Sequence, residues 1–476
     1  MPMATENLPK GVLGFWSIVF LSVIAIFPGS IYIVSSTTAL SFAGEAAPLT
    51  FVLGTALMFF NVIAVYIFST KVVNAGGFYK FVQKGTNSPV ISRAVAWDQF
   101  IAQMTPVIIS STVFGWLIPV TASTLFNVTL PTFIPFLASI LVVIFVFLVS
   151  YFGIKLSAII AMIVGIAQLI FITAAGIMIV SHSHYNTLGT FNIANSSGGL
   201  SGFFIGMVTG PLTAYIGYSA VVHFSEEAKF SKATMKKAII TSILVAGIFE
   251  TFMMYAISVG VPKSGLAALA GTYAPALLVT AKFVGVGFAL LVLIIALMGQ
   301  ITSPLTFGNA AERILYSLSR DNILPKSFSK IHPKYGSPSR ASLAVLVFAL
   351  AATLLTQIPM VLHYGVLTGF FYTVVVWATI LTVTNLIYHF AVNQSLAFLM
   401  NRLKELNILK HIVGPTIGSI FIIIIFYYSF LGLPFPFILA GPIVVIWFLI
   451  GLFISYRMRK VPLKESDVEQ TSQPPS

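Results

Sequence analysis

The sequence has 476 residues, of which 58% are hydrophobic and 8% charged, and its formal net charge is +13. Soluble domains carry about 25% charged residues, so this composition excludes a soluble globular protein and predicts an integral membrane protein. The absence of cysteine excludes disulfide bonds, thiolate metal sites and thiol nucleophiles.

The first predicted element is a long apolar run over residues 12–42, preceded by a short polar segment, residues 1–11. A cleavable signal has an apolar core of about 7–15 residues, so this run is predicted to remain as the first membrane span. The stretch IAIFPGSIYIVSS places Pro28, Gly29 and Ser30 near its centre. Because proline lacks an amide hydrogen, the helix is expected to break there.

Eleven further apolar segments follow, each near the roughly 20 residues that a helix needs to cross a bilayer. They lie at about 49–70, 90–124, 132–152, 156–180, 202–224, 237–260, 276–311, 341–358, 364–389, 412–432 and 435–456. The expected fold class is therefore an all-α integral membrane protein with twelve transmembrane helices. The last two, within residues 412–456, precede a polar tail, residues 457–476, that is expected to be disordered.

The basic residues support this division of the chain. Of its 25 lysines and arginines, only Lys263 and Lys282 fall on the side opposite the amino terminus. Because cytoplasmic loops are rich in Lys and Arg, both termini are predicted to be cytoplasmic, in a multi-pass protein of the plasma membrane. The positive charge is thus topological, and no nucleic-acid partner is expected.

The sixth segment, GFFIGMVTGPLTAYIGYSAVVHF, is also interrupted, at Thr209, Gly210 and Pro211. One such break is commonly a simple kink, but breaks at corresponding places in two halves are typical of transporters with inverted repeats. The predicted repeats are spans one to five, about 12–180, and six to ten, about 202–389. Together they form a transport core over 12–389.

Broken backbone at membrane depth is tolerated where its groups find other partners, and these can be ligands. Amides at Gly29, Ser30 and Ile31 begin a half-helix, whose positive end favours a carboxylate. Carbonyl oxygens near Ala25 and Ile26, and over 209–213, suit an ammonium group or a cation. A site that offers amide groups for a carboxylate and carbonyl oxygens for an ammonium group indicates an amino acid substrate.

Three loop segments then carry a resemblance to a known family. They are NAGGFYKFVQKG after span two, IGYSAVVHFSEEAKFSKATMKKAI after span six and AERILYSLSRDNILPKSF after span eight. With the two breaks, they make the chain similar, over nearly its whole length, to the amino acid–polyamine–organocation (APC) superfamily. The resemblance implies an amino acid permease with a LeuT-type five-plus-five inverted repeat and discontinuous helices 1 and 6.

The sequence departs from the family pattern at several places. Pro28 and Ser30 stand where the family's first-span motif has glycines. Thr213 takes the place of an aromatic residue that closes over the substrate in many members, so either Tyr215, Tyr218 or Tyr32 replaces it or the pocket is wider. Gln168 stands where many members carry a lysine in place of a sodium ion, which leaves the coupling ion open. No cofactor or certain metal site is expected beyond Na⁺ or H⁺ as a coupling ion.

Two acidic residues fall within predicted spans. Asp98 lies near one end of span three, where interfacial placement is the simpler interpretation, and Glu250 lies near the middle of span seven. Glu250 is either a proton-coupling group or a protonated structural carboxyl bonded to a neighbouring helix. Thr302 and Ser303 in span eight either form a sodium site or bond to their own helix.

Charges in the loops also allow two interpretations. They are either solvated side chains or an inward gate whose ion pairs break during transport. The residues concerned are Glu226, Glu227, Lys229, Arg320 and Asp321.

The predicted function is secondary active transport of amino acids by alternating access, either cation-coupled or by exchange. The alternatives are a polyamine or organic amine transporter, a gated channel and a receptor without flux. No phosphate-binding loop or nucleophile–base set is present, so an enzyme is not expected. The expected partners are the amino acid and the lipid bilayer, with monomer and homodimer both open.

The candidate residues divide into two groups. The substrate-binding candidates are Ala25, Ile26, Pro28, Gly29, Ser30, Ile31, Thr209, Gly210, Thr213, Tyr215 and Ile216. The coupling and gating candidates are Gln168, Glu250, Thr302, Ser303, Asp98, Tyr32 and Tyr218.

Overall fold

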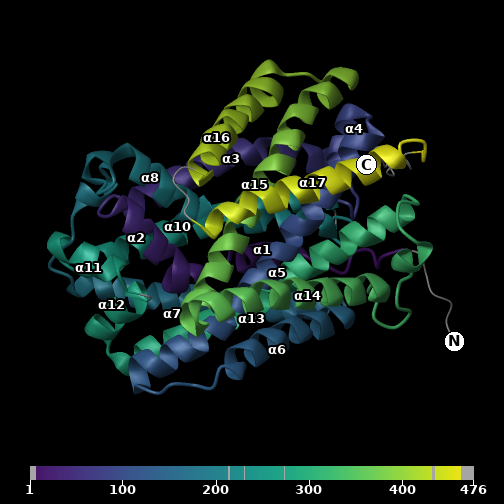
Figure 1. The fold of residues 1–476 in the computed structure, drawn as a ribbon. Coiled ribbons are helices and arrows are strands. Elements are labelled where there is room, and N and C mark those ends of the chain that lie inside the picture. Colours follow the sequence, from purple (N-terminus) through teal and green to yellow (C-terminus); the bar gives the residue numbers. More distant parts are fainter. Residues whose placement is uncertain (1–6, 213–214, 230, 273, 431–434, 463–476) are drawn as a thin grey trace.

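The computed structural model describes residues 7–212, 215–229, 231–272, 274–430 and 435–462 as a bundle of helices (Figure 1). In these residues, pairing of extended backbone is confined to isolated bridges. The longer elements are α1 (Phe15–Ile26), α2 (Ser36–Ala43), α3 (Ala47–Lys71), α4 (Phe78–Thr86), α5 (Pro89–Phe126), α6 (Phe133–Tyr151), α7 (Ile154–His182), α8 (Gly199–Met207), α10 (Ser231–Ser258), α11 (Leu266–Ala270), α12 (Pro275–Val284), α13 (Val286–Arg320), α14 (Ser339–Tyr364), α15 (Val366–Arg402), α16 (Gly414–Phe430) and α17 (Ala440–Arg457). Three shorter ones matter below: η1 (Ile31–Ser35), η4 (Val208–Leu212) and η5 (Ile216–Phe224).

Ten helical segments in the described residues are long and apolar enough to cross a membrane. They correspond to α3, α5, α6, α7, α10, α13, α14, α15, α16 and α17. Large apolar side chains on their outer faces are exposed, such as Leu362 (82%), Leu355 (74%) and Ile248 (71%). Such continuous apolar exposure suits lipid and not water, so the chain is an all-helical, multi-pass membrane protein.

The eighth predicted segment, 276–311, is wrong in its bounds. The structure has two helices there, α12 and α13, because Gly285 adopts a left-handed backbone (φ 91°) that ends the first. Glycine adopts this conformation at little cost because it lacks a Cβ. The tenth segment also differs, since α15 continues to Arg402 rather than ending at 389.

Helix α5 occupies the centre of the bundle. It packs against α4, α6, α13, α15 and α17. Within its apolar, membrane-spanning stretch, 83% is buried inside the protein. By contrast, α17 lies at the edge, with 17% of its apolar stretch buried inside the protein. A long helix buried on all sides is a rigid support for whatever polar groups it carries.

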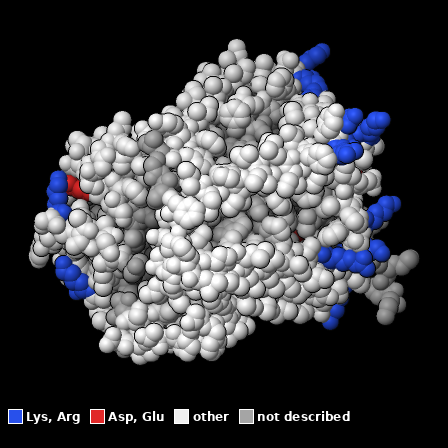
Figure 2. Space-filling view, in the orientation of Figure 1, with Lys and Arg blue, Asp and Glu red and all other residues white. Residues whose placement is uncertain are grey.

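Charged side chains mark the two ends of the bundle. Lys71 pairs with Glu405, and Arg402 donates to the carbonyl of Gly85, at the end where both termini of the described chain lie (Figure 1). We call this end the basic end. At the opposite end, Lys263 pairs with Glu45 at 2.6 Å. Figure 2 shows basic side chains gathered at the basic end, few at the other, and an uncharged surface between them.

Candidate functional site

The first apolar segment is interrupted where the sequence predicts. Helix α1 ends at Ile26, and Phe27 turns into the left-handed region (φ 61°, ψ 76°). Pro28 cannot donate to the helix and disfavours helical backbone in the residue before it, which explains the break. The chain then resumes as a five-residue π-helical turn, η1, that leads into α2.

The second interruption follows the same pattern. Helix α8 passes into another five-residue π-helical turn, η4, which contains Pro211, and the chain resumes as the 3₁₀-helix η5. Short π-helical turns are rare and concentrate at functional sites. Thr213 lies outside the described residues, and so does the side chain of Ile216.

The two interruptions lie side by side. Gly217 in η5 approaches the peptide between Ala25 and Ile26 so closely that an added Cβ would overlap it. The hydroxyl of Thr38 in α2 donates to the carbonyl of Thr209 (3.0 Å). The backbone at the end of α1 therefore contacts the start of η5, while α2 contacts η4 and α8.

Gln168 forms one wall of this region. Its amide nitrogen lies 2.9 Å from the position that a Cβ on Gly29 would occupy. The same nitrogen donates to the carbonyls of Ile295 (3.2 Å) and Ala296 (3.4 Å) in α13. Its amide oxygen is buried and has no hydrogen-bond partner among the described residues. The structure thus brings Gln168 to the first interruption, as a neutral donor.

Glu250 and Tyr215 are both enclosed near the second interruption. The Tyr215 hydroxyl and Thr55 of α3 share a hydrogen bond (2.7 Å), and the Glu250 carboxyl acts electrostatically on that tyrosine. Glu250 is 0% exposed, and neither of its oxygens has a hydrogen-bond partner in the part of the chain that is described. The interpretation of Glu250 as a carboxyl bonded to a neighbouring helix is therefore not supported.

The hydroxyl of Thr302 turns back to its own helix, α13, and donates to Met298 (3.0 Å). Ser303 beside it is buried. The contact from α13 to α1 is made instead by Thr306, which donates to the carbonyl of Leu21 (3.1 Å). Sequence reasoning missed Thr306, because nothing in its neighbourhood distinguishes it from other hydroxyls of the span.

The remaining gating candidates are all buried, at different places. Tyr32 lies in η1 beside Thr280 of α12. The Tyr218 hydroxyl lies 3.2 Å from a ring nitrogen of His389 in α15. Asp98 is 0% exposed, so its carboxyl is enclosed by protein. Helix α5, which carries it, packs against α15, α13 and α4.

Ion pairs close the basic end of the bundle. Glu227 receives two hydrogen bonds from Arg313, at 2.8 and 3.0 Å, and both side chains are 0% exposed. Lys80 pairs with Asp321 (2.6 Å), and Arg320 with Glu226 (2.6 Å). Solvated loop charge is therefore the wrong interpretation for these acids.

Backbone hydrogen bonds and Lys80 of α4 also hold the segments at the basic end together. Leu13 and Glu227–Lys229 exchange backbone hydrogen bonds of 3.0 and 2.8 Å. Burial lowers the pKa of Lys80, and the neighbouring Asp321 carboxylate opposes that shift. Lys229, in contrast to these paired residues, is exposed. Arg313 and Lys80 were missed because their partners lie far away in the sequence.

Comparison with known proteins agrees with this architecture. The family model described as amino acid permease matches residues 13–468. The chain is 27% identical over 353 residues to a branched-chain amino acid permease of Bacillus subtilis (strain 168), covering 70% of this chain and 72% of that protein. It is 24% identical over 309 residues to a low-affinity putrescine importer of Escherichia coli (strain K12), covering 62% and 65%.

The chain is also 32% identical over 136 residues to a methylthioribose transporter of Bacillus subtilis (strain 168), a match that covers 27% of each protein. All three relatives are named as transport proteins, and the family match extends over nearly the whole chain. The chain thus belongs to the amino acid permease family of the APC superfamily and is a transporter rather than an enzyme.

Proposed function

We propose that the chain carries amino acids across the plasma membrane by alternating access, with the substrate held between the two interrupted helices. The observation that carries this proposal is the contact between the interruptions, where Gly217 meets the Ala25–Ile26 peptide. Each interrupted segment counts as one span, which with the ten continuous helices gives twelve. Cytoplasmic termini are supported by the basic end, because Lys and Arg are retained on the cytoplasmic side.

The proposed fold is a five-plus-five inverted repeat, with α16 and α17 outside it. Support comes from the matching form of the two interruptions, each of which includes a π-helical turn. In this arrangement the start of η1 receives the substrate carboxylate, and carbonyls near Ala25 and Thr209 receive its ammonium group. The amide of Ser30 already donates to Phe27 (2.8 Å), so Ser30 contributes its hydroxyl instead.

The ion pairs at the basic end act as the inward gate in this proposal. Glu226 and Glu227 follow η5, whereas Arg313 and Arg320 belong to α13. Inward opening separates η5 from α13 and breaks both pairs. Because a buried charge without its partner is costly, opening requires water to enter as the pairs part.

A neutral amino acid fits the surroundings of the interruptions best. Phe27, Ala296 and Gly299 line the first one, and Glu250 is the carboxyl near the second. A polyamine is the second candidate, because one relative is named as a putrescine importer. Polycations require several acidic partners in their site, whereas the described neighbours of the interruptions provide one.

We propose a proton rather than sodium as the coupling ion. The carbonyls of Ile295 and Ala296, which suit a hard cation, already accept hydrogen bonds from Gln168. The hydroxyl of Thr302 donates to the carbonyl of Met298 in its own helix, α13. Glu250, in contrast, is buried without an ionic partner beside Tyr215. A carboxyl in that setting is stable when it carries a proton.

The test is uptake of labelled amino acids and of putrescine into proteoliposomes, under separate proton and sodium gradients. Saturable uptake and counterflow of a neutral amino acid, driven by an inward proton gradient, is the expected result. Uptake of putrescine alone would favour the amine alternative, and flux without saturation or counterflow would favour a channel. Binding without flux would identify a receptor.

Glu250→Gln is expected to abolish the dependence of uptake on the proton gradient while leaving counterflow intact. Glutamine keeps the size of the side chain but carries no exchangeable acid proton, and exchange of substrate for substrate needs none. The comparison is proton-driven uptake and counterflow in the same vesicles, with Glu405→Gln, a half-exposed acid paired with Lys71, as the control. Proton-driven uptake equal to that of the wild type would contradict the assignment.

A further inference from the structure

A second buried acid besides Glu250 lies in α5. Asp98 is fully enclosed in α5, and neither of its carboxyl oxygens has a hydrogen-bond partner within the described ranges. The enclosed acids nearer the basic end are different, since Glu227 is paired with Arg313 and Asp321 with Lys80. An unpaired carboxylate is far too costly to bury, so the enclosed form of Asp98 is the neutral, protonated one.

One residue connects Asp98 to the interrupted sixth segment. Tyr388 in α15 lies close enough to Asp98 for the two to interact electrostatically. The hydroxyl of Tyr388 also shares a hydrogen bond with Ser219 in η5 (2.9 Å) and bonds to Asn385 in its own helix. Tyr388 is completely buried, and its bond to Ser219 joins α15 to η5.

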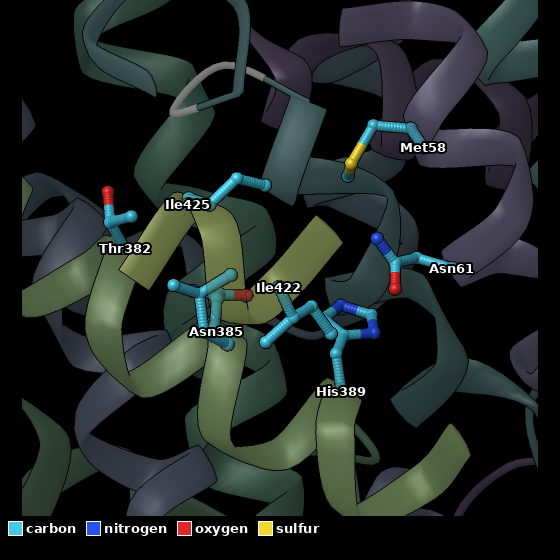
Figure 3. Close-up of a pocket in the computed structure, with 8 residues that line it drawn as sticks. Met58, Asn61, Thr382, Asn385, His389, Ile422 and Ile425 are labelled. Carbon is cyan, nitrogen blue, oxygen red and sulfur yellow. The ribbon is translucent and has the colours of Figure 1, made fainter. Parts of the chain in front are cut away.

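A small cavity with a mainly apolar lining lies on the far side of the same network. It has a volume of about 30 Å³ between α3, α15 and α16, and its polar lining consists of Asn61, Thr382, Asn385 and His389 (Figure 3). That space is enough for one or two water molecules. Asn385 belongs both to this lining and to the bond with Tyr388, and His389 contacts the Tyr218 hydroxyl (3.2 Å).

The other groups facing this part of α5 do not neutralise Asp98. Gln99, next to it, bonds to His223 of η5 (2.8 Å) and receives the Tyr79 amide (3.3 Å). In α4 and α13, Lys80, Arg313 and Arg320 are engaged in ion pairs, and Glu312 lies beside Arg313. Arg93 of α5 donates to the carbonyls of Met458 and Val461. The elements α14 and α17 meet α5 through the aromatic rings of Phe348 and Trp447.

We propose that Asp98 is a second proton-binding site of the carrier, closed while η5 packs against α15 and opened when that contact separates. In the closed state the carboxyl keeps its proton. When Ser219 leaves Tyr388, water from the open basic end reaches the carboxyl. The O–H bond of Asp98 then breaks, its proton joins a water oxygen, and the carboxylate remains solvated.

This proposal rests on the proposed transport function and gives it a direction. Asp98 lies nine residues into α5 from Pro89, which at 1.5 Å per residue is roughly 14 Å from the basic end of the helix. Glu250 lies eight residues before Ser258, the opposite end of α10. The two acids thus lie toward opposite ends of the bundle, Glu250 suited to loading a proton and Asp98 to releasing it inward.

Asp98→Asn tests the site by a measurement that does not require transport. Infrared difference spectra of the purified protein between neutral and alkaline pH are expected to contain the carbonyl stretch of protonated carboxyls. Part of that band is expected to be absent in Asp98→Asn and unchanged in Glu405→Gln. A band identical to that of the wild type in Asp98→Asn would overturn the proposal.

Tyr388→Phe provides the second variant, since it removes the hydroxyl that Ser219 contacts and keeps the ring. Water then reaches Asp98 without movement of η5, so the Asp98 band is expected to disappear at a less alkaline pH than in the wild type. An unchanged titration would overturn the proposal even if Asp98→Asn failed to fold. In proteoliposomes, Asp98→Asn is expected to reduce the number of protons moved per amino acid.

The outcomes separate the two proposals. Absence of amino acid flux in the wild type would refute the proposed function. Normal flux with an unchanged proton-to-substrate ratio in Asp98→Asn would refute the second proton site alone.

Discussion

Arg313→Ala is expected to destabilise the protein by about 3–5 kcal/mol, the cost typical of removing one partner from a buried ion pair. The guanidinium is 0% exposed and holds Glu227 through two hydrogen bonds, and Glu312 lies 3.6 Å away. Without it, two carboxyls remain enclosed with no counter-ion between them. The measurement is the free energy of unfolding by denaturant titration of the purified protein in micelles.

The matched control is the double variant Glu227→Leu, Arg313→Leu. Replacing a whole buried pair by apolar side chains is often close to neutral for stability, so the double variant is expected to be more stable than Arg313→Ala. It is also expected to weaken the closed state, because one of the two ion pairs between the segment after η5 and α13 is then lost and the Arg320–Glu226 pair remains. An Arg313→Ala protein as stable as the wild type would contradict the role of this pair.

Gly217→Ala is expected to abolish uptake. The added methyl group would overlap the carbonyl carbon and oxygen of Ala25 and the amide nitrogen of Ile26, all of them backbone atoms that have no other rotamer to adopt. The end of α1 and the start of η5 must therefore separate, which displaces the two interruptions relative to each other. Overpacking of this kind typically costs about 1–3 kcal/mol, and here it falls on the proposed substrate site.

Gly287→Ala is the control for this substitution. Gly287 lies in α13, and a Cβ there meets nothing within 4 Å. Because Gly287 is the second residue of α13 and its surroundings leave room for a methyl group, this variant is expected to fold and transport normally. Uptake that is equal in Gly217→Ala and Gly287→Ala would contradict the close contact between the interruptions.

The sequence was sufficient to predict the features that depend on local chemistry. Pro28 and Pro211 interrupt their helices because a missing amide hydrogen and a steric clash act within one turn. Long apolar segments predicted the all-helical membrane fold, and three loop motifs predicted the family. The boundary at Gly285 was missed because the surrounding residues are apolar, so composition alone continues the span through a backbone turn.

Features that depend on distant partners were not predictable in the same way. Glu227 and Arg313 are separated by 86 positions, so their burial as a pair follows from the packing of η5 against α13. Asp98 was expected at an interface because it lies near the end of a long helix. Its enclosure depends on α15, whose contributing residue, Tyr388, lies far along the chain.

The central claim is that the substrate lies at the interruptions, and Ser30 allows a direct test. The natural chain contains no cysteine, so Ser30→Cys introduces a single thiol at a half-buried position, close in size to serine. The transported amino acid is expected to protect this thiol from a small thiol reagent, with half-protection at the concentration that half-saturates uptake. Lys229→Cys, in an exposed loop, is expected to react equally with and without substrate. Saturable uptake by Ser30→Cys with no protection of its thiol would contradict the placement of the substrate.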